Sequence, residues 1–222
     1  MNVVFFFGLP GSGKGTQAEK LVERFGFFHF DTGKEIERTL YDSLFPDDPV
    51  IKRERAIFDS GVLNTPSWVE AIVRGRIREL SQEERSIVFS GSPRTLPEAE
   101  GITPLLEELY GKEALIPIFL DIPEAVSIAR NSKRKICKNR VCARVAAWDA
   151  MPDAIACFVC GSALGRRSVD EPHIIPDRIM QYRTRTAPVL DFLRQRGIGI
   201  MEIDGTSKPE AVHKEIISRF HF

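Results

Sequence analysis

The sequence predicts an α/β protein with three layers, in which helices cover both faces of a parallel sheet. Short apolar runs alternate along the chain with segments of helical periodicity, which is the pattern of strands and helices in such folds. The first apolar run, residues 3–7, is unbroken, as is typical of a central parallel strand buried on both faces. A glycine-rich loop and then a helix follow it directly. We therefore expect a five-stranded parallel sheet.

The glycine-rich loop, residues 8–16, reads GLPGSGKGT and has the character of a phosphate-binding loop. Its four glycines let the backbone curl so that successive N–H groups face one anion, and Lys14 adds a mobile positive charge. The N-terminus of the following helix faces the same place. A glycine-rich turn without a ligand is the alternative, but the lysine and the strand–loop–helix setting favour phosphate binding. The fold is then that of a P-loop NTPase.

The remaining elements follow from periodicity and from helix-end signals. The first helix is expected to end near Gly26, and another to begin with Thr65 as N-cap and Pro66 in its first turn. A long helix is expected at residues 177–196, and it must tolerate Pro188 or kink there. Further strands are predicted at residues 27–30, 87–89, 116–120 and 198–203, and further helices at 124–134 and 209–220.

Length, composition and charge exclude several classes of protein. The chain has 222 residues, 43% of them hydrophobic, which is enough for one main domain with a full core. Its 31 basic and 31 acidic residues balance, which argues against a general nucleic-acid or membrane surface. The apolar run near the N-terminus has no basic segment before it and predicts a strand rather than a signal peptide, and no stretch approaches transmembrane length. We expect a cytoplasmic protein.

Two segments interrupt the alternation of strands and helices. Residues 31–64 form an insertion that carries charges and two prolines. Residues 135–166 hold all four cysteines of the chain, as a C-x4-C pair followed by a C-x2-C pair: Cys137, Cys142, Cys157 and Cys160. In a protein without export signals, two such pairs predict a tetrahedral structural zinc site. Disulfides or unligated thiols are the alternatives, and they fit the expected compartment less well.

Short motifs occur along nearly the whole chain in a fixed order. They are residues 13–18 (GKGTQA), 31–33 (DTG), 61–63 (GVL), 91–95 (GSPRT), 121–123 (DIP), 186–188 (TAP) and 204–206 (DGT). With these motifs the chain resembles the adenylate kinase family, in the long form with a zinc-bearing lid. The resemblance implies a core of residues 1–30, 65–134 and 167–222, a monophosphate-binding insert at 31–64, and a lid at 135–166 that closes over ATP.

The resemblance also implies the chemistry, which is reversible transfer of a phosphoryl group from ATP–Mg²⁺ to a nucleoside monophosphate. Because charge spreads over the phosphate oxygens during transfer, cations must surround them. Lys14 would hold the β- and γ-phosphates, Arg94 would bind the acceptor phosphate, and Arg178 would bridge both nucleotides. Arg134 and Arg167 would reach the donor phosphates. Isolated arginines are usually solvated surface residues, but these occupy motif positions.

The remaining contacts implied by the resemblance fall into two binding sets and a metal site. Arg130, one helical turn before Arg134, would stack on the ATP adenine. The hydroxyls of Thr16 and Ser90 would reach Mg²⁺ through water. The ATP-binding residues would be Gly11, Ser12, Gly13, Lys14, Gly15, Thr16, Arg130 and Arg134, and the AMP-binding residues Thr32, Gly33, Arg38, Leu63, Gly91, Arg94, Glu98, Arg167 and Arg178. The family pattern further implies structural Zn²⁺ and a monomer.

Several residues depart from the family pattern. Ser90 replaces an aspartate and brings no negative charge near Mg²⁺, and Ser92 replaces an aromatic residue beneath Arg94. Glu37 stands where an arginine is expected, and the neighbouring Arg38 is rotated by about 100° around the helix, which makes it a doubtful phosphate ligand. One of two expected aspartates after the lid is Val169.

Glu98 replaces the glutamine that reads the adenine edge in the family. An ionised carboxylate only accepts hydrogen bonds, so Glu98 can accept from adenine N6, from guanine N1 and N2, or from cytosine N4. AMP remains the leading acceptor, and GMP, CMP or UMP are alternatives. Two other hypotheses about function remain. The chain could be a nucleotide-binding regulatory module without turnover, or a zinc ribbon that binds nucleic acid. The cysteine segment is basic but poor in aromatic residues, which disfavours the nucleic-acid reading.

Overall fold

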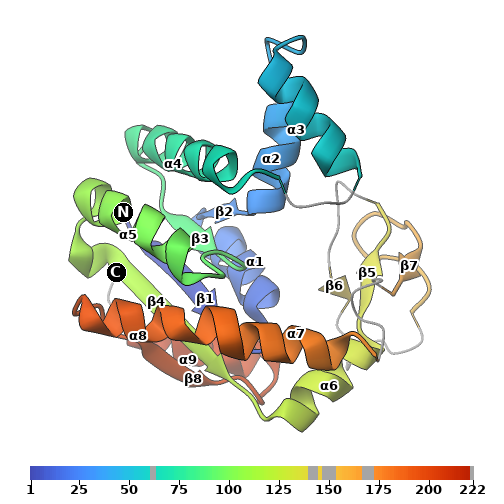
Figure 1. The fold of residues 1–222 in the computed structure, drawn as a ribbon. Coiled ribbons are helices and arrows are strands. Elements are labelled where there is room, and N and C mark those ends of the chain that lie inside the picture. Colours follow the sequence, from blue (N-terminus) through green and yellow to red (C-terminus); the bar gives the residue numbers. More distant parts are fainter. Residues whose placement is uncertain (61–63, 140–144, 147–153, 167–172, 221–222) are drawn as a thin grey trace.

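A parallel sheet of five strands forms the centre of the protein (Figure 1). The structure is a computed structural model that describes residues 1–60, 64–139, 145–146, 154–166 and 173–220. The strand order is β2–β3–β1–β4–β8, with bounds Phe28–Phe30, Ile87–Phe89, Val3–Phe7, Leu115–Asp121 and Met201–Asp204. The predicted three-layer α/β fold of a P-loop NTPase with a five-stranded parallel sheet is therefore confirmed.

The central strand β1 separates two hydrophobic clusters because its side chains alternate between the faces of the sheet. Val3, Phe5 and Phe7 belong to one cluster, which includes buried residues of α4 (Pro66–Gln82), α5 (Leu96–Tyr110) and α8 (Ala187–Gln195). Val4 and Phe6 belong to the other, with α1 (Lys14–Phe25) and α9 (Pro209–Arg219). This arrangement explains why all five residues of β1 are apolar and buried.

The last strand begins later than predicted. The sequence indicated a strand at residues 198–203, whereas β8 starts at Met201. The chain before it closes the end of α8: Gly197 has a φ of 72°, the Gly197 N–H donates to the Arg194 carbonyl, and the Ile198 N–H donates to the Leu193 carbonyl. These bonds satisfy the last helical carbonyls and keep residues 197–198 out of the sheet.

The predicted long helix at residues 177–196 is wrong in detail, because three elements form in its place. The α7 helix (Ile175–Gln181) is followed by a π-helical turn, Tyr182–Thr186, and then by α8 with Pro188 in its first turn. Proline lacks an N–H and its ring would clash with a carbonyl four residues earlier in an α-helix. The wider π-helical turn accommodates the proline without a break in the helical path.

Two arms extend from the sheet and its helices (Figure 1). The α2–α3 arm consists of α2 (Thr32–Tyr41) and α3 (Pro49–Asp59). The β5–β7 arm is an antiparallel sheet in the order β6–β5–β7, with bounds Val145–Ala146, Lys135–Cys137 and Leu164–Gly165. It follows α6 (Glu124–Lys133) directly, and a short 3-10 turn, Lys112–Ala114, precedes β4. No helix in the described part of the chain combines the length and apolarity needed to cross a membrane.

A buried carboxylate holds the end of the α2–α3 arm against α4. Glu54 of α3 is fully buried, and its carboxylate accepts hydrogen bonds from the Thr65 hydroxyl at 2.6 Å, the Thr65 N–H at 3.0 Å and the Asn64 amide at 3.1 Å. Arg53 donates to it as well, at 2.9 Å. Thr65 is the N-cap residue of α4, as predicted, but its hydroxyl serves Glu54 instead of the helix end.

Candidate nucleotide phosphate site

The phosphate loop connects β1 to α1 at the carboxyl end of the sheet, where ligands bind in parallel α/β folds. Its conformation requires glycine at two positions. Gly8 has a φ of 137°, and a Cβ there would lie 2.5 Å from the Leu120 carbonyl oxygen; Gly11 has a φ of 78°, and a Cβ there would lie 2.7 Å from the Asn131 amide. The buried Ser127 hydroxyl donates to the Pro10 carbonyl at 2.6 Å. The loop is therefore held firmly between β4 and α6.

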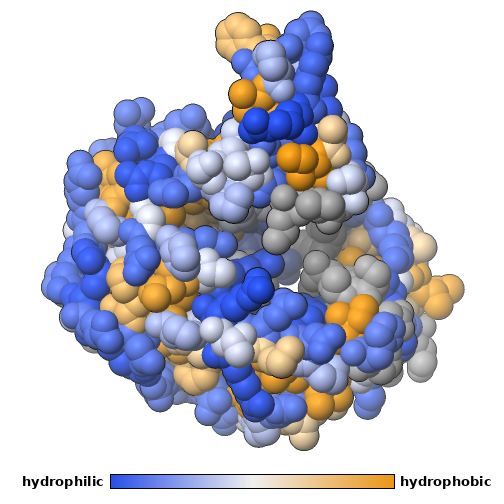
Figure 2. Space-filling model, viewed as in Figure 1, coloured by the Kyte–Doolittle hydropathy of each residue, from blue (hydrophilic) through white to orange (hydrophobic). Residues whose placement is uncertain are grey.

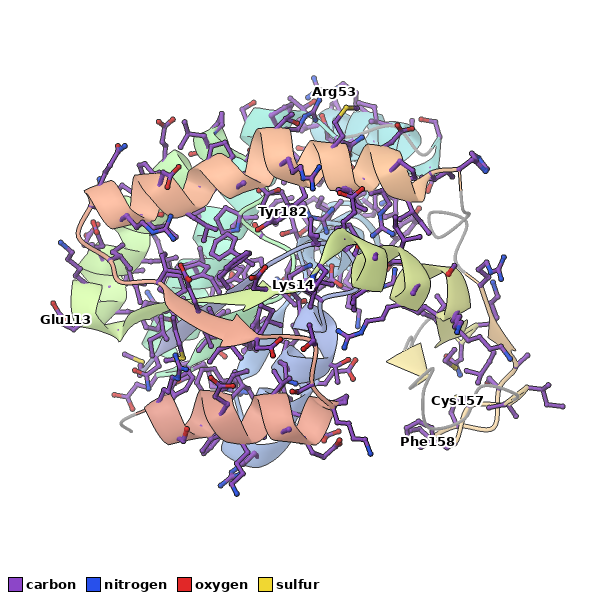
Figure 3. All side chains as sticks on the ribbon, turned by 90° about the horizontal axis from the view of Figure 1, so that it is seen from below. Lys14, Arg53, Glu113, Cys157, Phe158 and Tyr182 are labelled. Carbon is purple, nitrogen blue, oxygen red and sulfur yellow. The ribbon has the colours of Figure 1, made fainter. Side chains whose placement is uncertain are left out.

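Lys14, the first residue of α1, directs its ammonium group back into the loop and lies near the middle of the molecule (Figure 3). The ammonium donates to the Gly8 carbonyl at 2.7 Å and to the Leu9 carbonyl at 2.9 Å. Burial, together with the positive charges of Arg134, Arg178 and Arg94, lowers the pKa of Lys14 to about 7. Four cations thus converge on one place, an arrangement that stabilises a polyanionic ligand.

The three arginines reach this place from different elements. Arg94 lies in the loop between β3 and α5, and its side chain donates through Nε to the Gly91 carbonyl. Arg134 follows the last residue of α6, and Arg178 belongs to α7. Arg167 lies outside the described residues, so its predicted place beside them is untested. The face seen in Figure 2 is hollowed beneath the α2–α3 arm, and strongly hydrophilic residues line the visible part of this recess.

Arg130 is held by hydrogen bonds to backbone carbonyls of two loops. Its guanidinium donates to the Gly205 carbonyl at 2.8 Å and to the Thr206 carbonyl at 2.9 Å, with a longer contact of 3.5 Å to the Gly11 carbonyl. These bonds connect α6 to the loop after β8 and to the phosphate loop. One face of a guanidinium held in this way can still stack on a base.

A histidine that sequence reasoning missed contacts Ser90. His29 of β2 lies diagonally across from Ser90, which directly follows β3, and its Nε2 is 2.7 Å from the Ser90 hydroxyl. Burial lowers the pKa of His29, against an opposite effect of Asp31, so the ring is neutral at neutral pH. The signal was present in the sequence, since parallel strands that end together bring such residues to one edge. Thr16, the other predicted contact to Mg²⁺, is half-buried in the first turn of α1.

Two of the predicted acceptor-side residues, Thr32 and Gly33, lie where α2 begins. The Asp31 carboxylate caps α2 by accepting from the Gly33 N–H at 3.0 Å. The Thr32 hydroxyl is buried and has no hydrogen-bond partner within the part of the chain that the structure describes, so it is available to a ligand. Leu63 lies outside the described residues.

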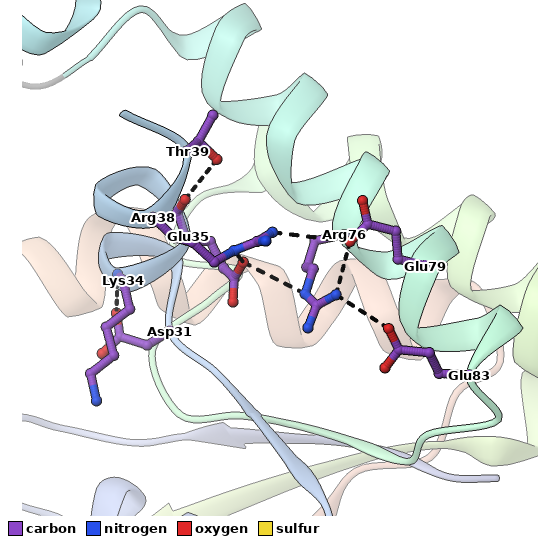
Figure 4. A network of polar contacts seen from close by, with 8 residues as sticks. All are labelled: Asp31, Lys34, Glu35, Arg38, Thr39, Arg76, Glu79 and Glu83. Carbon is purple, nitrogen blue, oxygen red and sulfur yellow. Dashed lines mark hydrogen bonds and ion pairs between the residues drawn. The ribbon is translucent and has the colours of Figure 1, made fainter. Parts of the chain in front are cut away.

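Arg38 takes part in a network of charges between α2 and α4 (Figure 4). Its Nε donates to the buried Glu35 carboxylate at 3.1 Å, and its Nη2 lies 4.0 Å from Glu79. Arg76 of α4 joins the same network through Glu79 at 2.8 Å and Glu83 at 3.6 Å. In this conformation the Arg38 guanidinium pairs with Glu35 and Glu79 and so supports the packing of α2 on α4.

Glu98 is placed beside Arg94 by the start of α5. Thr95 is the N-cap of this helix and accepts from the Glu98 N–H at 3.4 Å, while the Glu98 Oε2 accepts from the Arg94 N–H at 2.7 Å. This is a capping arrangement in which a side chain in the first turn reaches back past the N-cap. One carboxylate oxygen is thereby engaged, and the Glu98 side chain is exposed.

Three of the four cysteines meet in the β5–β7 arm. The sulfur atoms of Cys137, Cys157 and Cys160 all lie within 4.8 Å of one another, and those of Cys137 and Cys160 are 3.4 Å apart. Tetrahedral zinc with bonds of about 2.3 Å places its sulfur ligands roughly 3.8 Å apart, so the cluster fits a metal. A disulfide would require a separation of about 2.05 Å. Cys142 lies outside the described residues.

The fold and the site together define a P-loop protein that binds nucleotide phosphates, with cations from four elements around the loop. Comparison with known proteins narrows this class. The sequence model of the adenylate kinase family matches residues 6–198. The chain is 32% identical to the adenylate kinase of Petrotoga mobilis over 97% of its length and 95% of the relative. It is 32% identical to that of Kosmotoga olearia, over 97% of each, and 31% identical to that of Archaeoglobus fulgidus, over 97% and 96%. The chain belongs to the adenylate kinase family.

Proposed function

We propose that this chain transfers the γ-phosphoryl group of ATP–Mg²⁺ reversibly to AMP, giving two molecules of ADP. An oxygen of the AMP phosphate attacks the γ-phosphorus, and the bond from that phosphorus to the β,γ-bridging oxygen breaks with its electron pair on the ADP that leaves. The observation that carries the proposal is the convergence of Lys14 with Arg94, Arg134 and Arg178 on the phosphate loop. Such preorganised cations stabilise the charge that develops during transfer.

The cations divide between donor and acceptor in this proposal. Lys14 and the loop N–H groups bind the β- and γ-phosphates of ATP, and Arg134 and Arg167 support them. Arg94 binds the phosphate of AMP, and Arg178 contacts both nucleotides. Arg130 packs against the adenine of ATP, while its own hydrogen bonds keep it in place.

The proposed metal roles are distinct for the two ions. Mg²⁺ neutralises phosphate charge when it is bound with ATP. Thr16 and Ser90 present hydroxyl oxygens that can accept hydrogen bonds from metal-bound water, and the neutral His29 holds the Ser90 hydroxyl in place. Zinc stabilises the β5–β7 arm through Cys137, Cys142, Cys157 and Cys160, supported by the proximity of three of these sulfurs.

On the acceptor side, the proposal assigns AMP to the space between the α2–α3 arm and Arg94. Thr32, Gly33, Leu63 and Gly91 line it. The Glu98 oxygen that does not accept from Arg94 can accept a hydrogen bond from adenine N6, which is consistent with AMP. The inserts at residues 31–64 and 135–166 act as arms over the acceptor and the donor, and we further propose a monomer in the cytoplasm.

A kinetic comparison of acceptors tests the proposal. ADP formation from ATP–Mg²⁺ is measured with AMP, dAMP, GMP, CMP and UMP, for the wild-type protein and for Lys14→Met and Arg94→Ala. We expect AMP to be the dominant acceptor and both variants to lose at least about 10²-fold in kcat/KM. Dominance of another base would reassign Glu98 as its reader. No turnover with any acceptor would refute the kinase activity and favour a regulatory module.

A further inference from the structure

Side chains from two other elements hold the backbone of Arg94 on both sides. Its N–H donates to Glu98 Oε2 at 2.7 Å, and its carbonyl accepts from the Thr186 hydroxyl at 2.8 Å. Arg94 lies between β3 and α5, where the chain has no regular secondary structure. Its peptide groups therefore have no partner in a ladder or a helix and must find one elsewhere. Thr186 is 92 residues away in the sequence.

Thr186 uses its hydroxyl differently from the other helical threonines in its neighbourhood. Threonine in a helix commonly donates to the carbonyl four residues earlier. Thr184 does so, to Met180 at 2.9 Å, and Thr39 of α2 does so to Glu35 at 2.8 Å. Thr186, only two residues beyond Thr184, reaches instead across to the Arg94 loop. Its hydrogen bond is thus a contact between elements rather than a local one.

The π-helical turn that ends at Thr186 also approaches the phosphate loop. Tyr182, its first residue, lies with its hydroxyl buried near the strand ends, toward the middle of the molecule (Figure 3). Burial and the nearby Asp121 carboxylate raise the pKa of Tyr182 to about 12, and the backbone of Gly8 acts in the opposite direction. One turn of five residues therefore begins near Gly8 of the phosphate loop and, at its end, donates a hydrogen bond to the Arg94 loop. Such π-helical turns occur frequently at functional sites.

We propose that Thr186 is a positioning residue for Arg94. Its hydroxyl fixes the peptide that carries the Arg94 side chain, whose charge acts on Lys14, so that the arginine is preset relative to the phosphate loop before the acceptor binds. The inference rests on the proposed role of Arg94 in binding the acceptor phosphate. Because the π-helical turn carries the hydroxyl, the extra residue in this turn has a function besides accommodating Pro188.

Steady-state kinetics of Thr186→Val, Thr186→Ser and Thr184→Val tests the proposal, with each substrate varied at saturation of the other. Valine keeps the shape and removes the hydroxyl, whereas serine keeps the hydroxyl. We expect Thr186→Val to raise the KM for AMP and lower kcat, with a loss in kcat/KM for AMP on the order of tenfold, while the KM for ATP is unchanged. Thr186→Ser should recover most of the lost kcat/KM for AMP, and Thr184→Val should have the kinetic constants of the wild-type protein.

A merely structural role would give a different result. It would lower the melting temperature of Thr186→Val and raise both KM values together, and Thr186→Ser would show no specific rescue. That pattern, or unchanged kinetics in Thr186→Val, overturns the proposal.

Calorimetric titration with AMP separates this inference from the proposed function. Arg94→Ala should bind AMP weakly, and addition of Thr186→Val to it should cause no further loss, because the group to be positioned is gone. Weak binding in Arg94→Ala beside normal binding in Thr186→Val overturns the positioning role alone. Normal binding in Arg94→Ala overturns the proposed role of Arg94, and the inference with it.

Discussion

At the scale of single residues, Lys14 combines a buried ammonium group with three neighbouring positive charges. Burial and the charges of Arg134, Arg178 and Arg94 together lower the pKa of Lys14 to about 7. A bound polyphosphate would reverse the effect by placing negative charge against the ammonium. Ligand binding and proton binding at this residue are therefore linked.

We expect ATP binding to take up a proton at pH 8 and much less at pH 6. Above a pKa of about 7 the free protein holds Lys14 largely neutral, and the bound phosphates raise that pKa and draw a proton in. Calorimetric titrations in buffers of different ionisation enthalpy measure this uptake. Lys14→Met should abolish the pH-dependent uptake, and Lys20→Met, at a position of α1 that pairs with Glu210, should retain it. Equal uptake at both pH values would contradict the linkage.

The residues of the site differ in how far their roles could be predicted from the sequence. The phosphate loop and Lys14 were predictable, because glycine spacing and a lysine before a helix specify one backbone geometry. The contact between His29 and Ser90 could be inferred only from the pairing of their strands. The use of Thr186 was not predictable, because its partner is 92 residues away and neither residue type signals the contact. Arg130 and Arg38 were predictable as cations, but their hydrogen bonds depend on carbonyls and carboxylates that only the packing of helices brings near.

At the scale of elements, the α2–α3 arm depends on a carboxylate that is charged inside the protein. Burial acts to raise the pKa of Glu54, but hydrogen bonds from Thr65, Asn64 and Arg53 outweigh it and lower the pKa to about 2. A group whose pKa is depressed on folding contributes stability that is complete above its unfolded pKa and lost as the pH falls toward the folded value. Here that window lies between about pH 4.5 and pH 2.

Glu54→Gln should destabilise the protein at pH 7 by about 1–3 kcal/mol, because an amide brings donors where Thr65 and Asn64 already donate. It should also flatten the fall in stability between pH 4.5 and pH 2. Urea unfolding across this range is the measurement, with Glu113→Gln, at an exposed position in the turn before β4, as the control. If Glu54→Gln kept the pH dependence of the wild-type protein, the loss of stability at low pH would not come from Glu54.

The β5–β7 arm is small, and its strands are only three, two and two residues long. A metal at the cysteine cluster is therefore expected to supply much of its stability. We predict about one zinc per chain by elemental analysis, and loss of the metal and a lower melting temperature in Cys157→Ser. Ser162→Ala, in the same arm, should keep both. If the wild-type protein melted at the same temperature with and without metal, a stabilising role of the metal would be excluded.

At the scale of the whole molecule, the sheet joins the site to the core through aromatic packing. The ring of Phe89, the residue before Ser90, stacks on Phe5 at 5.1 Å between ring centroids and contacts Phe30 at 4.7 Å. These three strands end at the phosphate loop, at Ser90 and at Asp31, so the same core that stabilises the fold fixes the spacing of the site.

Phe89→Ala should cost about 3–5 kcal/mol of the free energy of unfolding, since it leaves a cavity among three strands. Much of the stability of a typical domain would be lost. Phe158→Ala, whose ring is 65% exposed, should change the free energy of unfolding by less than about 0.5 kcal/mol. Denaturant titration of both variants measures the two changes in the free energy of unfolding. Similar changes would show that the packing of Phe89 contributes no more to stability than the exposed Phe158.

The position of β1 in the sheet has a consequence for synthesis of the protein. Its five apolar residues leave the ribosome before β3 and β4, which cover both of its edges and end at Phe89 and Asp121. At about 5–20 residues per second, the nascent chain carries an unpaired and strongly hydrophobic strand for roughly 5–25 s. Such a segment is a site for aggregation and for chaperone binding. The strand that leads into the phosphate loop is thus also the segment that most needs protection from aggregation before folding is complete.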